Sequence, residues 1–238
     1  MSLAEIDHFL FFQSTLVVAF GGGLCALDRT AVFQGMFSRP LVAGLLSGIL
    51  AGNWEIGLLL GVVLELYYLN ELPVGTNIPT DDTLLALAAG GVGGVLRGLP
   101  AFVAWDDRAL ALVVLLTILP WAGLTRKLDA WVRERNQLLV EEAETALLAG
   151  RNLSAIDFHL YGFLNFYFAA VVGLVVIMAV SLGIGWLLLR LLPLGLEPLL
   201  AHLLIVFPLF GIAGLLSGMN KKRLLAVFAG TAFCLLLV

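Results

Sequence analysis

Glu65 is the residue of this sequence best placed to do chemistry, because it is an acid in the middle of an apolar stretch. Every other residue of the segment 62–69 is apolar or tyrosine. In the middle of a bilayer an ionised carboxylate costs at least about 2.5–3.5 kcal/mol, so it faces protein or water. Helical spacing places Glu65 on the same narrow face as Gly57 and Gly61, the side that can pack closely. We interpret Glu65 as a functional carboxylate; the alternative is a structural carboxylate held by a neighbouring helix.

A polar run joins this segment to the next apolar one. Residues 70–82 contain amides, hydroxyls and carboxylates, with two prolines and a glycine that prevent a regular helix. The backbone groups of such a segment are free to bind a ligand, and its mixed donors and acceptors match the hydroxyl groups of a sugar. We take Asn77, Asp81 and Asp82 as candidate substrate ligands. The alternative is an ordinary surface loop, with Asp81 or Asp82 capping the next helix.

A second polar segment, 28–40, follows the first apolar stretch and adds Asp28 and Gln34 to the candidate ligands. Asp28 and Arg39 could instead simply pair with each other at the membrane interface. The sequence shows no nucleophile elbow, no metal-ligand spacing and no phosphate-binding glycine loop. We therefore predict no catalytic residue, no cofactor and no metal in this chain.

The composition limits the class of protein that positions these residues. Of the 238 residues, 61% are apolar and 13% are charged, against roughly 45–50% and about a quarter in a soluble domain. These values exclude a soluble enzyme and a disordered chain, and the net charge of -4 argues against a nucleic-acid-binding domain. We predict an all-α, polytopic integral membrane protein in the lipid bilayer.

The apolar segments predict both complete spans and shorter helices. The stretches Phe9–Leu27 and Phe163–Leu189 have the roughly 20 residues that a spanning helix needs. The stretch Leu41–Leu69 is interrupted at residues 53–55, which predicts a pair of short helices in a re-entrant or hairpin arrangement. Such a pair must be surrounded by protein. Short apolar helices of this kind favour a transporter over a simple membrane anchor.

Glycines recur at intervals of four residues, which lets helix backbones approach closely in a membrane. The spaced glycines are Gly44, Gly48 and Gly52, then Gly57 and Gly61, and later Gly90 and Gly94. The sequence Gly-Leu-Leu-Ser-Gly occurs at 44–48 and again at 214–218, which is weak support for an inverted repeat of the kind found in transporters.

A third and longer polar segment is rich in charged residues. Its charged residues are concentrated between 125 and 150, and its spacing predicts an amphipathic helix outside or along the bilayer. We therefore divide the chain into an N-terminal membrane half with the polar loops, 1–124, a polar connector, 125–157, and a C-terminal membrane half, 158–238.

The motifs around the polar segments resemble a known family. These motifs are Leu27-Asp28, Ser38-Arg39-Pro40-Leu41-Val42, Gly61-Val-Val-Leu64-Glu65-Leu66, Gly75-Thr-Asn-Ile-Pro79-Thr80-Asp81 and Gly150-Arg-Asn152-Leu-Ser-Ala-Ile156. Their order and spacing are similar to those of the enzyme IIC subunit of the mannose/fructose/sorbose-type sugar phosphotransferase system.

The resemblance implies a sugar-translocating subunit in a bacterial inner membrane. It implies a IID membrane partner, with the two subunits assembling as a trimer of IIC–IID heterodimers. Cytoplasmic IIA and IIB subunits would carry the phosphoryl group from phosphoenolpyruvate to a hexose. The residues alone leave two other functions open. One is an ion-coupled permease in which Glu65 or the pair Asp81 and Asp82 carries protons, and the other is a non-transporting sensor or scaffold.

Overall fold

The protein is helical throughout the part that the structure describes. The structure, a computed structural model, describes residues 3–32, 34–69, 71, 79–150, 155–218 and 222–236. Its helices are α1 (Leu3–Leu27), α2 (Pro40–Leu50), α3 (Trp54–Tyr67), α4 (Asp82–Gly98), α5 (Asp107–Ile118), α6 (Ala122–Leu148), α7 (Ala155–Leu191), α8 (Glu197–Leu203), α9 (Val206–Gly218) and α10 (Lys222–Leu236). Three stretches are long and apolar enough to cross a membrane: Asp107–Leu148, Ile156–Leu191 and Leu194–Ser217. The prediction of an all-α polytopic membrane protein is confirmed.

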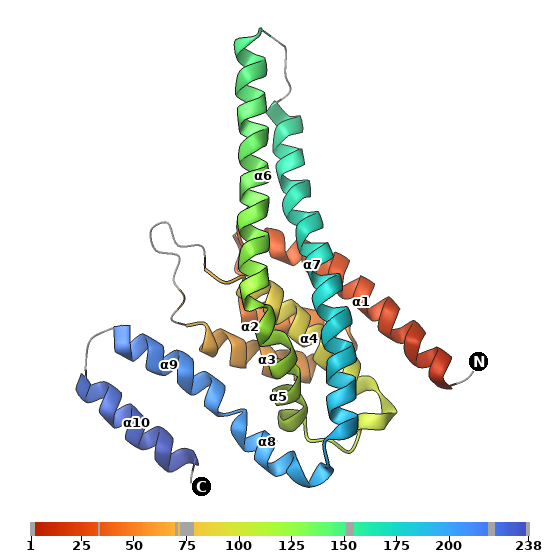
Figure 1. The fold of residues 1–238 in the computed structure, drawn as a ribbon, viewed down its shortest axis with the longest axis vertical. Helices are drawn as coiled ribbons and strands as arrows, with labels where there is room; N and C mark the ends of the chain where they lie inside the picture. The colour runs from red at the N-terminus through yellow and green to blue at the C-terminus, as the bar shows by residue number, and fades with distance from the viewer. Residues whose placement is uncertain are drawn as a thin grey trace.

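Helix α4 is the centre of the molecule, surrounded by α1, α2, α3, α5 and α7 (Figure 1). Every residue from Thr83 to Leu96 is buried, as expected for a helix that is apolar on all sides. Its glycines are distributed over its faces. Gly90 and Gly94 contact α2, whereas Gly91 contacts Met178 of α7 and Gly93 contacts α3. The glycines therefore let several helices pack closely around one axis.

Helices α2 and α3 form the predicted hairpin. A Cβ atom added to Gly48 would lie 2.7 Å from the Cα atom of Gly57, and one added to Gly44 would lie 2.7 Å from the Cα atom of Gly61. The two backbones are thus in direct contact, and the spaced glycines have the packing role that the sequence indicates.

The turn of this hairpin corrects one prediction. Gly52 does not belong to the packed face, because nothing lies within 4 Å of a Cβ atom added there. Its φ angle is 87°, a left-handed conformation that glycine adopts without steric cost. The next residue, Asn53, begins α3 by accepting a hydrogen bond of 3.2 Å from the Ile56 N–H. Gly52 and Asn53 therefore reverse the chain and cap the second helix.

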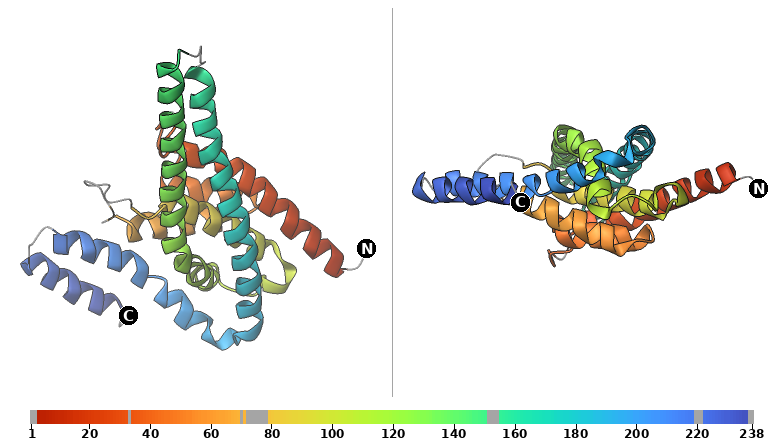
Figure 2. Two further views of the ribbon diagram at one scale, coloured as in Figure 1. Left: turned by 45° about the horizontal axis from the view of Figure 1, so that its top comes forward. Right: turned by 90° about the horizontal axis from the view of Figure 1, so that it is seen from below.

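Helix α6 follows α5 in the chain and packs against α7 as an antiparallel pair that projects from the rest of the molecule (Figures 1 and 2). A short 3-10 turn at Leu119–Trp121 separates α5 from α6, where Pro120 cannot donate a backbone hydrogen bond. The buried Ser181 of α7 stabilises this break. Its hydroxyl donates to the Thr117 carbonyl over 3.2 Å and accepts from the Trp121 indole over 3.1 Å.

The sequence changes from apolar to polar between residues 124 and 125, where we placed the end of the N-terminal membrane half. This position lies inside α6, and the helix continues across it. Only Thr125, Val132 and Ala146 of α6 are buried. Helices α8, α9 and α10 extend to the opposite side from α1 (Figure 1), with α9 against α3 and α10 against α9. The division into two membrane halves and a connector, and the inverted repeat, stay predictions.

Candidate functional site

The predicted polar residues gather where four helix ends meet. Contacts join the segment after α1 to the start of α2, to the last turn of α3 and to the start of α4. We call this cluster the polar junction, and it consists of Asp28, Arg29, Ser38, Arg39, Glu65, Glu71, Thr80, Asp81, Asp82, Thr83 and Arg126. Two helices, α2 and α4, begin here, and the partial positive charge of a helix N-terminus favours the carboxylates placed beside it.

Glu65 lies in the last turns of α3 and faces the first turn of α2. Its carboxylate accepts a hydrogen bond of 3.3 Å from the Leu41 N–H and forms an ion pair with Arg39. The Glu65 side chain is 16% exposed, whereas that of Arg39 is 60% exposed. The carboxylate is therefore held by a neighbouring helix, as the structural interpretation expects, but the pair that it forms is open on the arginine side.

The Asp28 carboxylate is hydrogen-bonded to the segment that links α1 to α2. It accepts hydrogen bonds from the Gly35 N–H (2.6 Å), the Ser38 N–H (3.1 Å) and the Ser38 hydroxyl (3.2 Å). Desolvation of Asp28 raises its pKa, but these hydrogen bonds to the ionised form together outweigh it and hold the pKa below its ordinary value. The suggested pairing of Asp28 with Arg39 is wrong, because Arg39 binds Glu65 instead.

Asp81 and Asp82 share one cation. Asp81 caps α4 by accepting from the Leu84 N–H over 3.1 Å, and Arg29 Nη1 lies 3.1 Å from its Oδ1. Asp82 also forms an ion pair with Arg29, whose Nη2 donates to the Thr80 carbonyl over 2.8 Å. The capping alternative for Asp81 is therefore confirmed. Both acids are therefore paired with the same side chain, Arg29, from the other polar segment.

Hydroxyl groups extend the junction to α6. The Thr83 hydroxyl donates to the Ser38 carbonyl over 2.7 Å and so connects α4 to the start of α2. Arg126 of α6 donates to the Thr80 hydroxyl over 3.2 Å, and Glu71 accepts from the Thr80 N–H over 2.9 Å. The junction therefore joins the N-terminal helices to the base of the projecting pair α6 and α7.

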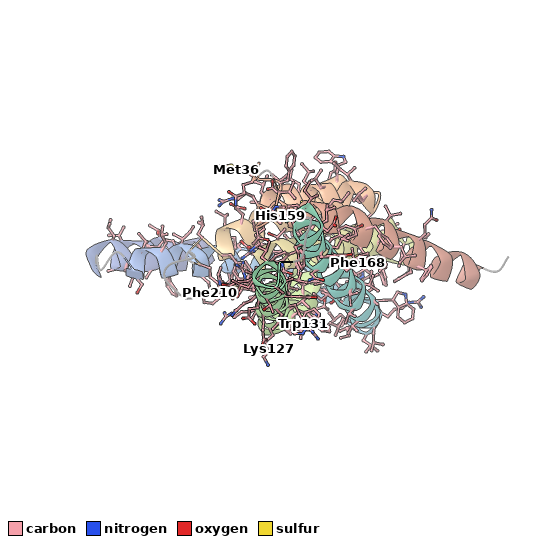
Figure 3. The ribbon with its side chains drawn as sticks, turned by 90° about the horizontal axis from the view of Figure 1, so that it is seen from above. Met36, Lys127, Trp131, His159, Phe168 and Phe210 are labelled. Carbon is pink, nitrogen blue, oxygen red and sulfur yellow. The ribbon has the colours of Figure 1, made fainter. Side chains whose placement is uncertain are left out.

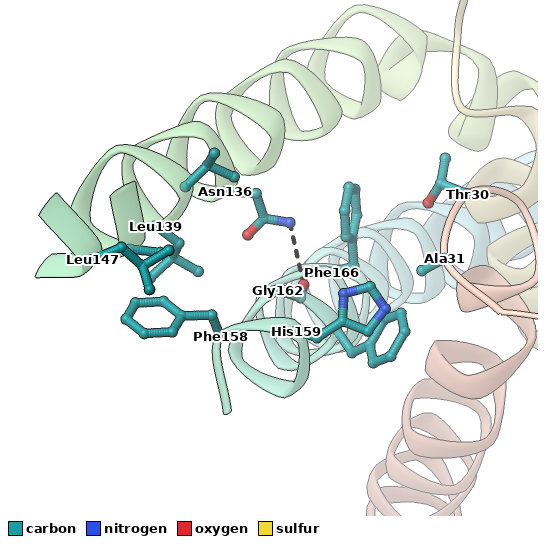
Figure 4. A pocket seen from close by; sticks show the side chains of 12 residues that line it. Thr30, Ala31, Asn136, Leu139, Leu147, Phe158, His159, Gly162 and Phe166 are labelled. Carbon is teal, nitrogen blue, oxygen red and sulfur yellow. Dashed lines mark hydrogen bonds between the residues drawn. The ribbon is translucent and has the colours of Figure 1, made fainter. Parts of the chain in front are cut away.

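A small cavity of about 30 Å³ lies beside Arg29, Asp81 and Asp129, a volume suited to a water molecule. A much larger groove of about 500 Å³ lies between α6 and α7, and Figure 4 shows the side chains around it. The groove is mainly apolar, and its Asn136 amide is used in a 3.2 Å hydrogen bond to the Gly162 carbonyl. It contains none of the predicted ligands. Within the described residues, no group of three or more His, Cys, Asp or Glu could hold a metal ion.

Comparisons with known proteins decide the family. The family model described as the sorbose-specific IIC component of the PTS matches residues 11–238. This chain belongs to that family. It is thus a IIC membrane component of the mannose and sorbose type, as the motifs of its polar segments indicate.

Solved structures share the fold of this IIC chain. One, described as the structure of a membrane protein, has a TM-score of 0.65 at 20% sequence identity. The similarity covers 93% of this chain and 83% of the chain in that structure. Another, the mannose transporter ManYZ in complex with microcin E492, has a TM-score of 0.53 at 21% sequence identity. Here the similarity covers 95% of this chain and 85% of the other. No curated protein gives a significant match.

One predicted ligand of the IIC chain lies apart from the rest, and another is outside the part of the chain that the structure describes. Gln34 lies at the exposed end of the segment between α1 and α2, with a φ angle of 52°. Seen from above, the neighbouring Met36 lies on the opposite side of the molecule from Lys127 and Trp131 of α6 (Figure 3). Asn77 lies outside the described residues. The structure therefore brings together four of the six predicted ligands.

Sequence reasoning missed the contacts that the arginines of the junction make. Arg29, Arg39 and Arg126 each contact a predicted ligand or Thr80. The hairpin gave one usable signal, because residues 41 and 65 are equally far from its turn at Asn53 and so lie side by side. This symmetry places Arg39 near Glu65. The sequence carries no comparable signal for Arg29 and Asp81, which are 52 residues apart.

Proposed function

We propose that this IIC chain translocates a hexose across a bacterial inner membrane and that the sugar binds at the polar junction. Its proposed partners are a IID membrane subunit, in a trimer of IIC–IID heterodimers, and the cytoplasmic IIA and IIB subunits that supply the phosphoryl group. The sequence resemblance and the family membership support this assignment, and the polar junction supplies a set of groups suited to the substrate.

The observation that carries the proposal is the pair formed by Glu65 and Arg39. A sugar hydroxyl both donates and accepts hydrogen bonds, and this pair offers a carboxylate acceptor beside a guanidinium donor. The 60% exposure of Arg39 leaves part of the guanidinium accessible. A hydroxyl that donates to Glu65 and accepts from Arg39 would replace part of the ion pair without leaving either group unsatisfied.

The remaining predicted ligands have two different roles in this proposal. Asp28, Asp81 and Asp82 already hold protein groups, so they fix the segments around the sugar and contact it through their remaining lone pairs. Gln34 and Asn77 belong to the adjacent polar segments and would complete the contacts. The transported sugar would leave the junction by a movement of one packed unit against another.

The test is uptake of labelled sugar into vesicles that contain this chain with IID, IIA and IIB subunits. Mannose, fructose, sorbose and N-acetylglucosamine are each offered, and the internal product is analysed for phosphate. We expect sugar phosphate that accumulates only with phosphoenolpyruvate. Uptake of free sugar that an uncoupler abolishes would contradict the proposal and favour an ion-coupled permease. An assembled complex that takes up none of these sugars would favour a sensor.

The role of Glu65 is tested with Glu65→Gln, which preserves shape but removes the charge. We expect sugar binding to fall by about tenfold or more, since a hydrogen bond to a charged group contributes about 1.5–3 kcal/mol. The matched control is Glu55→Gln, because Glu55 is an exposed acid on the same helix. Equal sugar affinity in the two variants, with normal assembly, would remove Glu65 from the site.

A further inference from the structure

An apolar groove runs between α1 and α7, on the other side of α7 from α6. Its volume is about 710 Å³, and its lining residues are Phe11, Phe12, Thr15, Leu16, Val175, Ala179, Leu182, Gly183, Trp186 and Arg190. Gly183 lies in its wall with no atom within 4 Å of an added Cβ atom. The groove has no part in the polar junction, so it calls for a separate explanation.

The groove results from the way in which α1 crosses α7. At the crossing, a Cβ atom added to Gly23 would lie 2.7 Å from Val171, and one added to Gly22 would lie 3.0 Å from Leu174. The glycines let the two helices touch there. Away from that point α1 diverges from α7 toward its N-terminal end (Figures 1 and 2). The space between the diverging helices is the groove. Its position is set by Gly22 and Gly23, because these glycines determine where α1 and α7 touch.

One end of the groove carries a positive charge. Arg190 lies in the last turn of α7, and its guanidinium lies 5.0 Å from the centre of the Trp186 ring. Among the side chains that the structure describes, none forms an ion pair with Arg190. Tryptophan and arginine at the end of a spanning helix are typical of the membrane surface. A charge at such a position is suited to the depth of the lipid phosphates.

We propose that this groove is a phospholipid site, with one acyl chain between α1 and α7 and the lipid phosphate on Arg190. Charge complementarity favours this occupant over a helix of another polypeptide. An apolar helix would fill the groove but would give the guanidinium no anion, whereas a phosphodiester accepts the parallel N–H groups of an arginine. The site is distinct from sugar binding and does not depend on the proposed function.

The test is native mass spectrometry of the full chain, released from detergent after incubation with dioleoylphosphatidylglycerol or dioleoylglycerol. The first probe has a phosphate and the second has the same acyl chains without one. Gly183→Leu adds a side chain to the wall of the groove at a position where an added Cβ atom meets no protein atom, and Gly123→Leu is its control because Gly123 is an equally open helical glycine. Arg190→Gln removes the charge, and Arg108→Gln is its control because Arg108 is an exposed arginine at the start of α5.

We expect the phosphatidylglycerol adduct to fall about fivefold in Arg190→Gln, the effect of one basic residue at a membrane surface. It should fall at least as far in Gly183→Leu and persist in both controls, with thermal unfolding unchanged. The dioleoylglycerol adduct should be weaker in the natural chain and insensitive to Arg190→Gln. Equal adducts in all variants would overturn the proposal. The proposal would also be overturned if the Gly183→Leu variant kept its lipid but no longer assembled with a IID subunit. That result would mean that a helix of the partner subunit, and not a lipid, fills the groove.

Discussion

Removing the Arg29 side chain tests the charge arrangement of the polar junction. Arg29 is the ion-pair partner of both Asp81 and Asp82, and the three side chains are 19%, 12% and 29% exposed. Replacing it with methionine keeps most of the volume but leaves two largely buried carboxylates without their cation. Breaking a buried ion pair by removing one partner costs about 3–5 kcal/mol. Because Asp82 is partly in contact with solvent, we expect the lower end, about 3 kcal/mol.

The assay is thermal unfolding of the purified chain. For a chain of this size 1 kcal/mol shifts the Tm by about 2–4 °C, so Arg29→Met should lower it by about 6–12 °C. Arg108→Met is the control, since its ion pair with Asp106 is exposed and contributes at most about 1 kcal/mol.

A second variant distinguishes lost charge from lost packing. Adding Asp81→Asn and Asp82→Asn to Arg29→Met removes the unpaired charges, and asparagine still caps a helix. We expect this triple variant to recover at least half of the lost Tm. A Tm for Arg29→Met within about 2 °C of the natural chain would refute the reasoning, as would a triple variant no more stable than the single one.

Three further predictions concern packing, pH and the break between α5 and α6. Gly57→Ala should lower the free energy of unfolding by about 1–3 kcal/mol, because the added Cβ atom meets the backbone of α2. Gly123→Ala should be neutral or stabilising. Equal Tm values for the two variants would contradict the hairpin contact. The pKa of Asp28 is lower in the folded state than its ordinary value of 3.8, so its stabilisation is complete above that value and lost as pH falls through the folded pKa. Asp28→Asn should therefore show a smaller fall in Tm on acidification, and an unchanged profile would argue against these hydrogen bonds. Ser181→Ala leaves the Thr117 carbonyl and the Trp121 indole without their shared partner, so it should lower the free energy of unfolding by about 1–3 kcal/mol. A Tm equal to that of the natural chain would show that this contact is dispensable.

The sequence predicts the helices better than it predicts their arrangement. The apolar stretches locate α1, α2, α3 and α7, because length and hydropathy are local properties of the chain. The α2–α3 hairpin follows from its polar turn at Asn53, where a side-chain cap starts the second helix. The crossing of α1 and α7 and the central position of α4 depend on which glycine faces which neighbour, and spacing alone does not state the partner.

The site shows the same division between local and distant information. The helix-capping role of Asp81 is predictable because the cap and its N–H are three residues apart. The alternative pairing of Arg39 with Asp28, the nearer acid in the sequence, is wrong because the hairpin brings Glu65 closer to Arg39 in space. Arg29 reaches across 52 residues to Asp81, and only the packing of α1 against α4 brings these residues together.

The glycine contacts around α4 have a consequence for the mechanics of the chain. Glycine has no side-chain rotamers to lose, so at these contacts only the facing side chains, such as Leu60 against Gly93, give up conformational entropy. Where backbone meets backbone, as between Gly48 of α2 and Gly57 of α3, no side chain can change rotamer and loosen the interface. These three helices therefore behave as one stiff body. The polar junction lies at the end of that body, and any displacement of the body carries Glu65, Asp81 and Asp82 along as a fixed set.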